Sequence, residues 1–252
     1  MGGLRERNQS GQAAVESAIV LPLFVFLILG ILQLGLMHQA RLLTKYAAYK
    51  AVRAGALNSA KVDVMESAAL AVLMPLLSVP GARGAYIPPV GSAAEFQEKW
   101  REVSGNRIPG TSLKHAEVTV CGPTRSDVGG SGPELDFDDP RNTAPTGWRE
   151  SHRTKLRVQV TFNYRMIIPF ADWVIYQSTR GRQMASVLRM QSKAPEGDGA
   201  RERTESQLEE AAGQRIYISP IRATYTMRMQ SNFFLNRAAL PGSNECVFPF
   251  AY

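Results

Sequence analysis

Hydrophobic and polar positions divide the chain into one long apolar run near its start and a longer region of short periodic segments. Residues 18–37, AIVLPLFVFLILGILQLGLM, are 20 positions without a charged side chain. A helix of that length extends about 30 Å, which matches the hydrocarbon core of a bilayer. A buried helix of a soluble protein is amphipathic, whereas this run is apolar on every side. The pattern predicts a transmembrane helix over 18–37, interrupted by Pro22, Gly30, Gln33 and Gly35.

The residues after this run predict that the helix continues into water. Leu42, Tyr46 and Tyr49 share one helical stripe, and the basic residues lie mainly on the opposite side. The apolar residues close beside the stripe are Leu43, Ala47, Ala51 and Ala54. Gly55 is expected to end the helix, because glycine is common just past a helix C-terminus. We therefore expect one helix over 12–55, half of it in lipid and half amphipathic.

Beyond residue 56, shorter patterns predict an α+β domain that spans 56–252. Helical spacing occurs at 60–74, 93–105, 171–177 and 199–214, and strand-like alternation at 115–121 and 156–164. Residues 182–190 fit a strand or a short helix, 122–147 form a long irregular loop, and 216–230 read as an extended pair around Pro220. We expect an antiparallel sheet with short helices, packed on the outer half of the long helix.

The same patterns predict which side chains are buried. The inward positions of the second helix are expected to be Val62, Met65, Ala69, Val72 and Leu73. Phe96 and Trp100, four residues apart, are expected to be buried under the third helix.

Composition and charge exclude few functions. With 44% hydrophobic and 20% charged residues the chain can bury a core, which excludes wholesale disorder. The net charge of +7 is compatible with nucleic acid, anionic lipid or an acidic polymer as a neighbour. The basic residues are spread along the chain rather than clustered, so we expect no specific nucleic-acid partner.

Cys121 and Cys246 are the two cysteines of the chain. Two are too few for a disulfide scaffold or for a structural zinc site by themselves. If the domain lies outside the cytoplasm, one disulfide would tie the C-terminal tail to the domain, and two free buried thiols are the alternative.

Candidate catalytic groups are scarce. The chain has no phosphate-binding glycine loop, no nucleophile elbow and no HExxH motif. The histidines lack ligand spacing; they are His38, His115 and His152. An acidic cluster lacks the later glycine and glutamate of an EF-hand and is expected to be a solvated loop; it consists of Asp136, Asp138 and Asp139. We expect no enzymatic activity, cofactor or metal; a membrane-tethered hydrolase with an unrecognised site is the enzymatic alternative.

A short motif stands directly before the apolar run. Gly11 is followed at the fifth position by Glu16, and a short leader with Arg5 and Arg7 precedes it. This arrangement resembles the processing site of type IV prepilins. The stretch GQAAVESAIVLPLFVFLILGILQLG is similar to the pseudopilins of the tight-adherence (Tad) pilus, the TadE-like family, whose N-termini run glycine, small residues, Val-Glu and an apolar run with an early Leu-Pro-Leu. The resemblance covers about residues 8–55.

The resemblance implies a specific fate for the N-terminus. A prepilin peptidase would cleave between Gly11 and Gln12, which makes residues 1–11 a leader peptide. Glu16 would then pair with the new α-amino group on a neighbouring subunit; the alternative is a residue that only favours the helix N-terminus. Gln12 stands where major type IV pilins commonly carry phenylalanine, which favours a minor or assembly subunit. Other pilin or pseudopilin subunits and the Tad assembly platform are the implied partners.

Charge and resemblance predict opposite orientations. Basic residues are more numerous after the span than before it, so a count of positive charges favours a domain inside the cell. The resemblance instead implies a single-pass protein of the bacterial inner membrane with its C-terminal domain periplasmic. An unprocessed single-pass envelope anchor of a secretion or adhesion complex is the alternative function.

Overall fold

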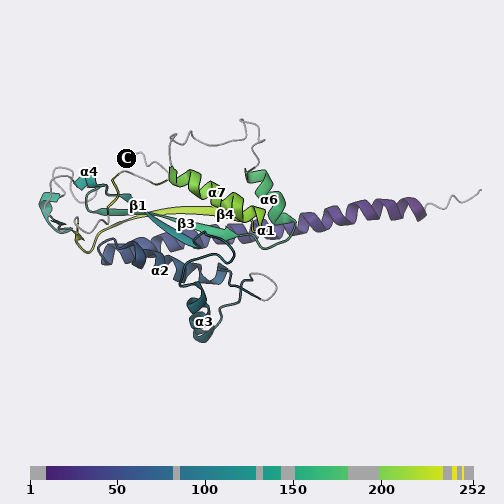
Figure 1. Cartoon of the computed structure of the whole chain (residues 1–252), viewed down its shortest axis with the longest axis horizontal. Coiled ribbons are helices and arrows are strands. Elements are labelled where there is room, and N and C mark those ends of the chain that lie inside the picture. The colour runs from purple at the N-terminus through teal and green to yellow at the C-terminus, as the bar shows by residue number, and fades with distance from the viewer. Residues whose placement is uncertain are drawn as a thin grey trace, which may run out of the picture.

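A single long helix runs the length of the molecule, with a small sheet lying along its C-terminal half (Figure 1). The computed structural model describes residues 10–81, 86–128, 133–142, 151–180, 199–234, 240–242 and 246. The sheet and the shorter helices leave the N-terminal half of the long helix uncovered. The expected α+β architecture, an antiparallel sheet with short helices after a long N-terminal helix, is confirmed.

The long helix, α1, spans Ser10–Leu57 and includes Pro22 in its apolar part. The prediction that Gly55 ends it is wrong, because the helix continues for two more residues. The left-handed positions that follow are Ser59 and Ala60, with φ of 54° and 57°. Gly55 instead is buried where other elements approach the helix backbone closely.

Three antiparallel strands form the sheet in the order β1-β3-β4. They are β1 (Ala116–Gly122), β3 (Lys155–Arg165) and β4 (Ile218–Arg228). β3 is the central strand, and its residues from Val158 to Tyr164 are buried on both faces. β4 is one continuous strand rather than the extended pair that was expected around Pro220. Proline lacks an N–H, and an edge strand can dispense with one.

Helix α2 (Val62–Leu73) packs against α1 and β1, and the 3-10 turn η1 (Met74–Leu76) follows it. Met65, Ala69 and Leu73 are buried as expected, whereas Val62 is exposed and Leu70 takes a place in the core instead. The main core therefore lies between the sheet on one side and the C-terminal half of α1 with α2 on the other.

The third helix, α3 (Ala93–Val103), begins with a capping box of Ser92 and Glu95. Phe96 and Trp100 stack with ring centroids 6.1 Å apart, but both are only partly buried, and Lys99 is the buried side chain between them. The prediction that Phe96 and Trp100 are buried is therefore confirmed only in part, because both pack against the core but stay partly exposed. The aliphatic stem of a lysine can lie along apolar surface while its charged end reaches a polar partner.

The remaining described elements are short, apart from one longer helix. The loop expected over 122–147 contains α4 (Arg125–Val128), β2 (Glu134–Leu135) and η2 (Pro140–Asn142), and β2 pairs with β5 (Phe233–Phe234). Helices α6 (Ala171–Arg180) and α7 (Gly199–Gly213) lie where helical spacing predicts them. α7 carries a second small core with Leu208 and Ala211. The segment 182–190 lies outside the described residues.

Candidate membrane helix and its junction with the domain

The N-terminal half of α1 has the surface of a membrane-spanning helix. Its large apolar side chains are exposed in all directions from Val15 to Leu32, apart from the half-buried Leu29, and Ile19 and Leu23 reach 68% and 67% exposure. A soluble protein would bury such a surface, so its exposure along successive turns indicates that lipid covers it. The helix is long and apolar enough to cross a bilayer.

The residues of the predicted processing site lie in the first two turns of this helix. Because α1 begins at Ser10, both Gly11 and Gln12 have helical backbone, and only the backbone is described over 10–13. Glu16 is exposed. Gln12 and Glu16 are four residues apart, which is about one helical turn. A new amino group on Gln12 would therefore start at the same end of the helix as the carboxylate.

The domain begins to cover α1 at Gln33. This side chain is fully buried, and its Oε1 accepts a hydrogen bond of 3.1 Å from the backbone N–H of Ile168, which lies between β3 and α6. Leu36 and Met37 pack against the main core three and four residues later. Protein therefore covers one side of the last turn of the predicted span 18–37, while Leu34 on its other side is 57% exposed. The uncovered apolar stretch is 14–32.

Small side chains form the covered face of α1. The buried positions are Ala40, Thr44, Ala47, Ala48, Ala51, Val52, Gly55 and Ala56. The predicted stripe is different: Leu42 and Tyr46 are 54% and 49% exposed. Small residues let α2 and the sheet approach the helix backbone, and Thr44 satisfies its buried hydroxyl by donating to the Ala40 carbonyl at 2.8 Å.

Gly55 marks the closest approach. A Cβ at this position would lie 2.7 Å from Leu156 Cδ2 on β3 and would also collide with Met65 Sδ on α2. Because the backbone of Gly55 is helical, packing rather than backbone conformation favours glycine here: a larger residue would have to displace the buried side chains of Leu156 and Met65. Two other glycines of α1, Gly30 and Gly35, have open space where a Cβ would stand, within the described part of the chain.

A serine from the end of the sheet completes the C-terminus of α1. The N–H of Ala60 donates to the Gly55 carbonyl at 2.8 Å, as in a Schellman motif. The second bond of that motif is replaced by Ser231, whose Oγ accepts from the N–H of Ser59 at 2.8 Å and donates to the Ala56 carbonyl at 2.9 Å. The sheet and the long helix are thus joined at both ends of the covered segment, by Gln33 at one and Ser231 at the other.

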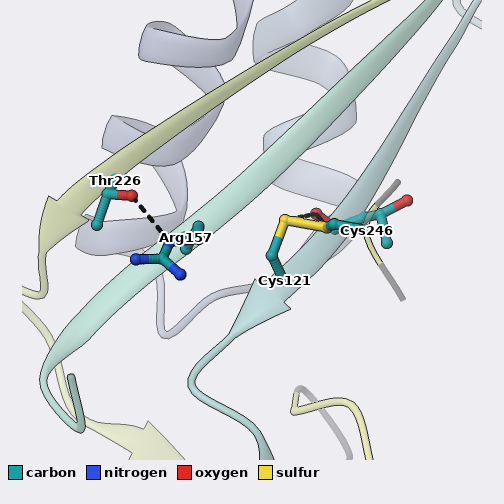
Figure 2. The surroundings of a disulfide bond; sticks show 5 residues. Cys121, Arg157, Thr226 and Cys246 are labelled. Carbon is teal, nitrogen blue, oxygen red and sulfur yellow. Dashed lines mark hydrogen bonds between the residues drawn. A yellow bond between two sulfur atoms is a disulfide. The ribbon is translucent and has the colours of Figure 1, made fainter. Parts of the chain in front are cut away.

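Cys121 and Cys246 form a disulfide, with their Cα atoms 5.4 Å apart (Figure 2). The bond connects β1 to a residue 125 positions later in the chain. On the neighbouring strands, Arg157 Nε donates to Thr226 Oγ1 at 3.2 Å across the β3–β4 pair, as Figure 2 shows. The disulfide fixes one point of the C-terminal segment beside the sheet.

The histidines occupy unlike environments. His115 is buried, and burial together with the charges of Lys99 and Arg165 lowers its pKa to about 4. It is therefore neutral at pH 7. Lys99 donates to the Pro88 carbonyl at 3.1 Å, and burial lowers its pKa to about 8. His38 and His152 are exposed. Among the described residues, no three histidine, cysteine or acidic side chains gather as metal ligands would.

The acidic cluster is engaged in ion pairs with arginine. Asp139 pairs with Arg141 at 2.8 Å, and the hydrogen bonds from Arg141 lower the pKa of the Asp139 carboxyl. Asp138 lies 3.5 Å from Arg228 at the end of β4. Asp136 accepts from the backbone N–H of Asp138 at 2.9 Å, which shapes the turn. These contacts fit a solvated loop.

Sequence reasoning did not identify one feature of the junction, the segment from Ile167 to Trp173. Three of its apolar side chains are exposed beside the point where α1 leaves the domain; they are Ile167, Phe170 and Trp173. The available signal was the apolar run IIPF at 167–170, which lies between the strand predicted over 156–164 and the helix predicted over 171–177 and belongs to neither.

Comparison with known proteins places the likeness on α1. Residues 11–53 match the family model of TadE-like proteins. No curated protein and no solved structure matches the chain. The matched segment runs from the first turn of α1 to the packed turn before Gly55, so it includes both the bare and the covered half. Proteins of this family are structural components of pili rather than enzymes. The N-terminal helix of this chain is therefore similar to the TadE-like family over residues 11–53.

Proposed function

We propose that the protein is a minor pseudopilin, or assembly subunit, of a Tad-type adhesion pilus, anchored in the bacterial inner membrane by the bare half of α1. One observation carries the proposal: the TadE-like match at 11–53 falls on a helix whose first half is exposed and apolar and whose second half holds a folded domain. Such a helix can pack against copies of itself in lipid and in a filament while the domain faces outward.

Processing by a prepilin peptidase is the first step of the proposed function. Cleavage between Gly11 and Gln12 would remove the basic leader and create an α-amino group one helical turn before Glu16. In an assembly of parallel helices, the amine of one subunit and the carboxylate of the next would neutralise each other in a medium that disfavours single charges. Glu16 lies on the exposed surface of α1, where a neighbouring helix can reach it.

An extracytoplasmic position of the domain is the second part of the proposal. Disulfides persist in oxidising compartments and are rare in the cytosol, so the Cys121–Cys246 bond favours the periplasmic side. This consideration agrees with the orientation that the family resemblance implies and opposes the one that the count of positive charges favours.

The first test is the N-terminal sequence and intact mass of the protein purified from its native membranes. A chain that begins at Gln12 supports the proposal. A chain that retains the leader in cells with active prepilin peptidase contradicts it, and favours an unprocessed envelope anchor of a secretion or adhesion complex.

A second test separates processing from assembly. We expect Glu16→Ala to be cleaved and inserted normally but to abolish incorporation or piliation, whereas Glu16→Asp retains part of it because the charge is kept. Gly11→Val, at the cleavage site, is expected to block processing itself. Normal piliation in the Glu16→Ala strain would show that the carboxylate has no role in assembly.

A further inference from the structure

An exposed apolar turn stands beside the point where α1 leaves the domain. It comprises residues 167–173, between β3 and the second turn of α6, and is called the 167–173 turn below. Its exposed side chains include Ile167 at 43%, Phe170 at 72% and Trp173 at 52%. We infer that the 167–173 turn is a second membrane contact, which seats in the boundary between headgroups and acyl chains of the bilayer that α1 crosses.

The position of the turn along α1 comes from one hydrogen bond. Ile168 donates its backbone N–H to the buried side chain of Gln33, so the turn is fixed at the first covered residue of α1. The bare stretch before it, 14–32, extends about 28 Å at 1.5 Å per residue, which is the thickness of a bilayer core. If that stretch spans the bilayer, the 167–173 turn lies at its surface. Figure 1 shows α6 at the end of the domain from which the bare helix emerges.

The local structure presents the aromatic rings outward. Ala171 and Tyr176 are buried, and the Tyr176 ring packs at 5.3 Å from that of Tyr217, so this face of α6 is fixed against the domain. Phe170 and Trp173 are three residues apart and lie on the opposite, exposed side. Phe170 also adopts a left-handed backbone with φ of 69°. A bulky side chain is rarely found in that conformation, and strain of this kind is often kept for a function.

The composition of the turn suits lipid better than a soluble partner. Tryptophan is enriched at membrane interfaces, where the ring lies in the apolar boundary and the indole N–H reaches water or headgroups. Phenylalanine and isoleucine add buried apolar area in the same plane. The turn is also continuous with the bare surface of α1, so one bilayer can cover both. This inference rests on the membrane anchoring in the proposed function, but not on processing or pilus assembly.

The test uses the fluorescence of a single tryptophan in the full-length chain. Trp100 and Trp148 are replaced by phenylalanine, which leaves Trp173, and the protein is reconstituted into phosphatidylcholine vesicles. Some vesicles carry bromine near the headgroup end of the acyl chain and others near its terminal methyl. We expect the Trp173 emission to shift to the blue on reconstitution and to be quenched by the shallow bromines more than by the deep ones.

The matched control retains Trp100 alone, with Trp148 and Trp173 replaced by phenylalanine. Trp100 is partly buried on α3, which projects from the side of the domain (Figure 1). We expect its emission to be unaffected by either brominated lipid. Equal quenching of the two variants would reflect non-specific adsorption of the domain and would overturn the inference.

The remaining outcomes distinguish lipid from a second copy of the chain as the partner that contacts the 167–173 turn. Vesicle flotation without quenching of Trp173 overturns the membrane contact while leaving the anchor intact. If Trp173 is then shielded from aqueous acrylamide only at high protein-to-lipid ratios, the turn binds another copy of the chain and lipid contact is excluded. Failure to float with the vesicles overturns both this inference and the anchoring on which it rests.

Discussion

Gln33 and Ile168 are joined by a hydrogen bond that marks the boundary between the bare and the covered half of α1. Gln33 reads in the sequence as a polar interruption of an apolar run, and the structure gives it a partner. Its Oε1 accepts a hydrogen bond from the backbone N–H of Ile168, in the segment that connects β3 to α6. The Gln33 side chain is fully buried, so water does not compete for this oxygen.

We expect Gln33→Leu to destabilise the junction, because leucine fills a similar volume but leaves the Ile168 N–H without its acceptor. An unsatisfied buried donor costs about 1–3 kcal/mol, and we expect the low end of that range because Ile168 is only partly buried. Thermal unfolding of the full chain in detergent, followed by near-UV circular dichroism, measures the loss. Gln39→Leu is the control, since Gln39 is exposed on the same helix. Equal stability of the two variants would mean that the hydrogen bond does not hold the junction.

Gly55→Ala is expected to destabilise the domain, because the added methyl would press on Leu156 and Met65. Overpacking of a core typically costs about 1–3 kcal/mol, more than the gain of up to about 1 kcal/mol that alanine offers over glycine in a helix. Gly30→Ala, where an added Cβ meets open space in the bare half of the same helix, is the control and should leave the stability of the domain unchanged. Urea unfolding in detergent compares the two. A Gly55→Ala protein as stable as the Gly30→Ala protein would contradict close packing as the reason for this glycine.

Local patterns predicted the elements of the fold well and their contacts less well. Strong periodicity placed α2, β1, β3 and α6, because apolar and polar residues recur at a regular spacing in each segment. The apolar face of α1 was predicted only in part: Ala47 beside the predicted stripe is buried, whereas Leu42 and Tyr46 on the stripe are exposed. The alanine face is buried because the sheet and α2 need close approach, which is a property of the partner elements rather than of the helix sequence.

The candidate site shows the same division. The Gly11–Glu16 spacing and the apolar run are local features, so both could be recognised in the sequence. The hydrogen bond between Gln33 and Ile168 joins residues 135 positions apart. The hydrogen bond from Ser231 to the Ala56 carbonyl joins residues 175 positions apart. No local periodicity encodes such distant pairs. The 167–173 turn was not identified in the sequence for this reason: its position at the end of the bare helix depends on the contact with Gln33.

The disulfide predicts a measurable restraint on the C-terminal segment. The intact mass of protein from its native membranes is expected to be lower by two hydrogen atoms than that of the reduced chain. Removing both thiols, as Cys121→Ser with Cys246→Ser, should cost about 2–4 kcal/mol of stability and expose the C-terminal tail to limited proteolysis. Single replacement of Cys246 should in addition leave one alkylatable thiol at Cys121. Full alkylation of both cysteines in the untreated native protein would contradict the bond.

His115 predicts how stability depends on pH. Its pKa in the folded protein is about 4, below the ordinary value of about 6.5. Between pH 6.5 and pH 4, His115 is therefore protonated in the unfolded chain and neutral in the folded chain. The free energy of unfolding should therefore fall as the pH is lowered from 6.5 to 4, with His115 contributing about 3 kcal/mol by the lower limit.

The variant His115→Phe isolates this contribution, because phenylalanine cannot be protonated. Phenylalanine also loses the hydrogen bond of His115 to the Arg107 backbone, so the slope of stability with pH is compared rather than its absolute value. We expect its stability to decline less steeply than that of the unmodified protein over the same pH range, in urea unfolding of the full chain in detergent. His152→Phe, at an exposed histidine, is the control and should retain most of the original pH dependence. If His115→Phe and the unmodified protein lose stability in parallel, acid sensitivity arises from the carboxylates, and His115 is not excluded from protonation by its burial.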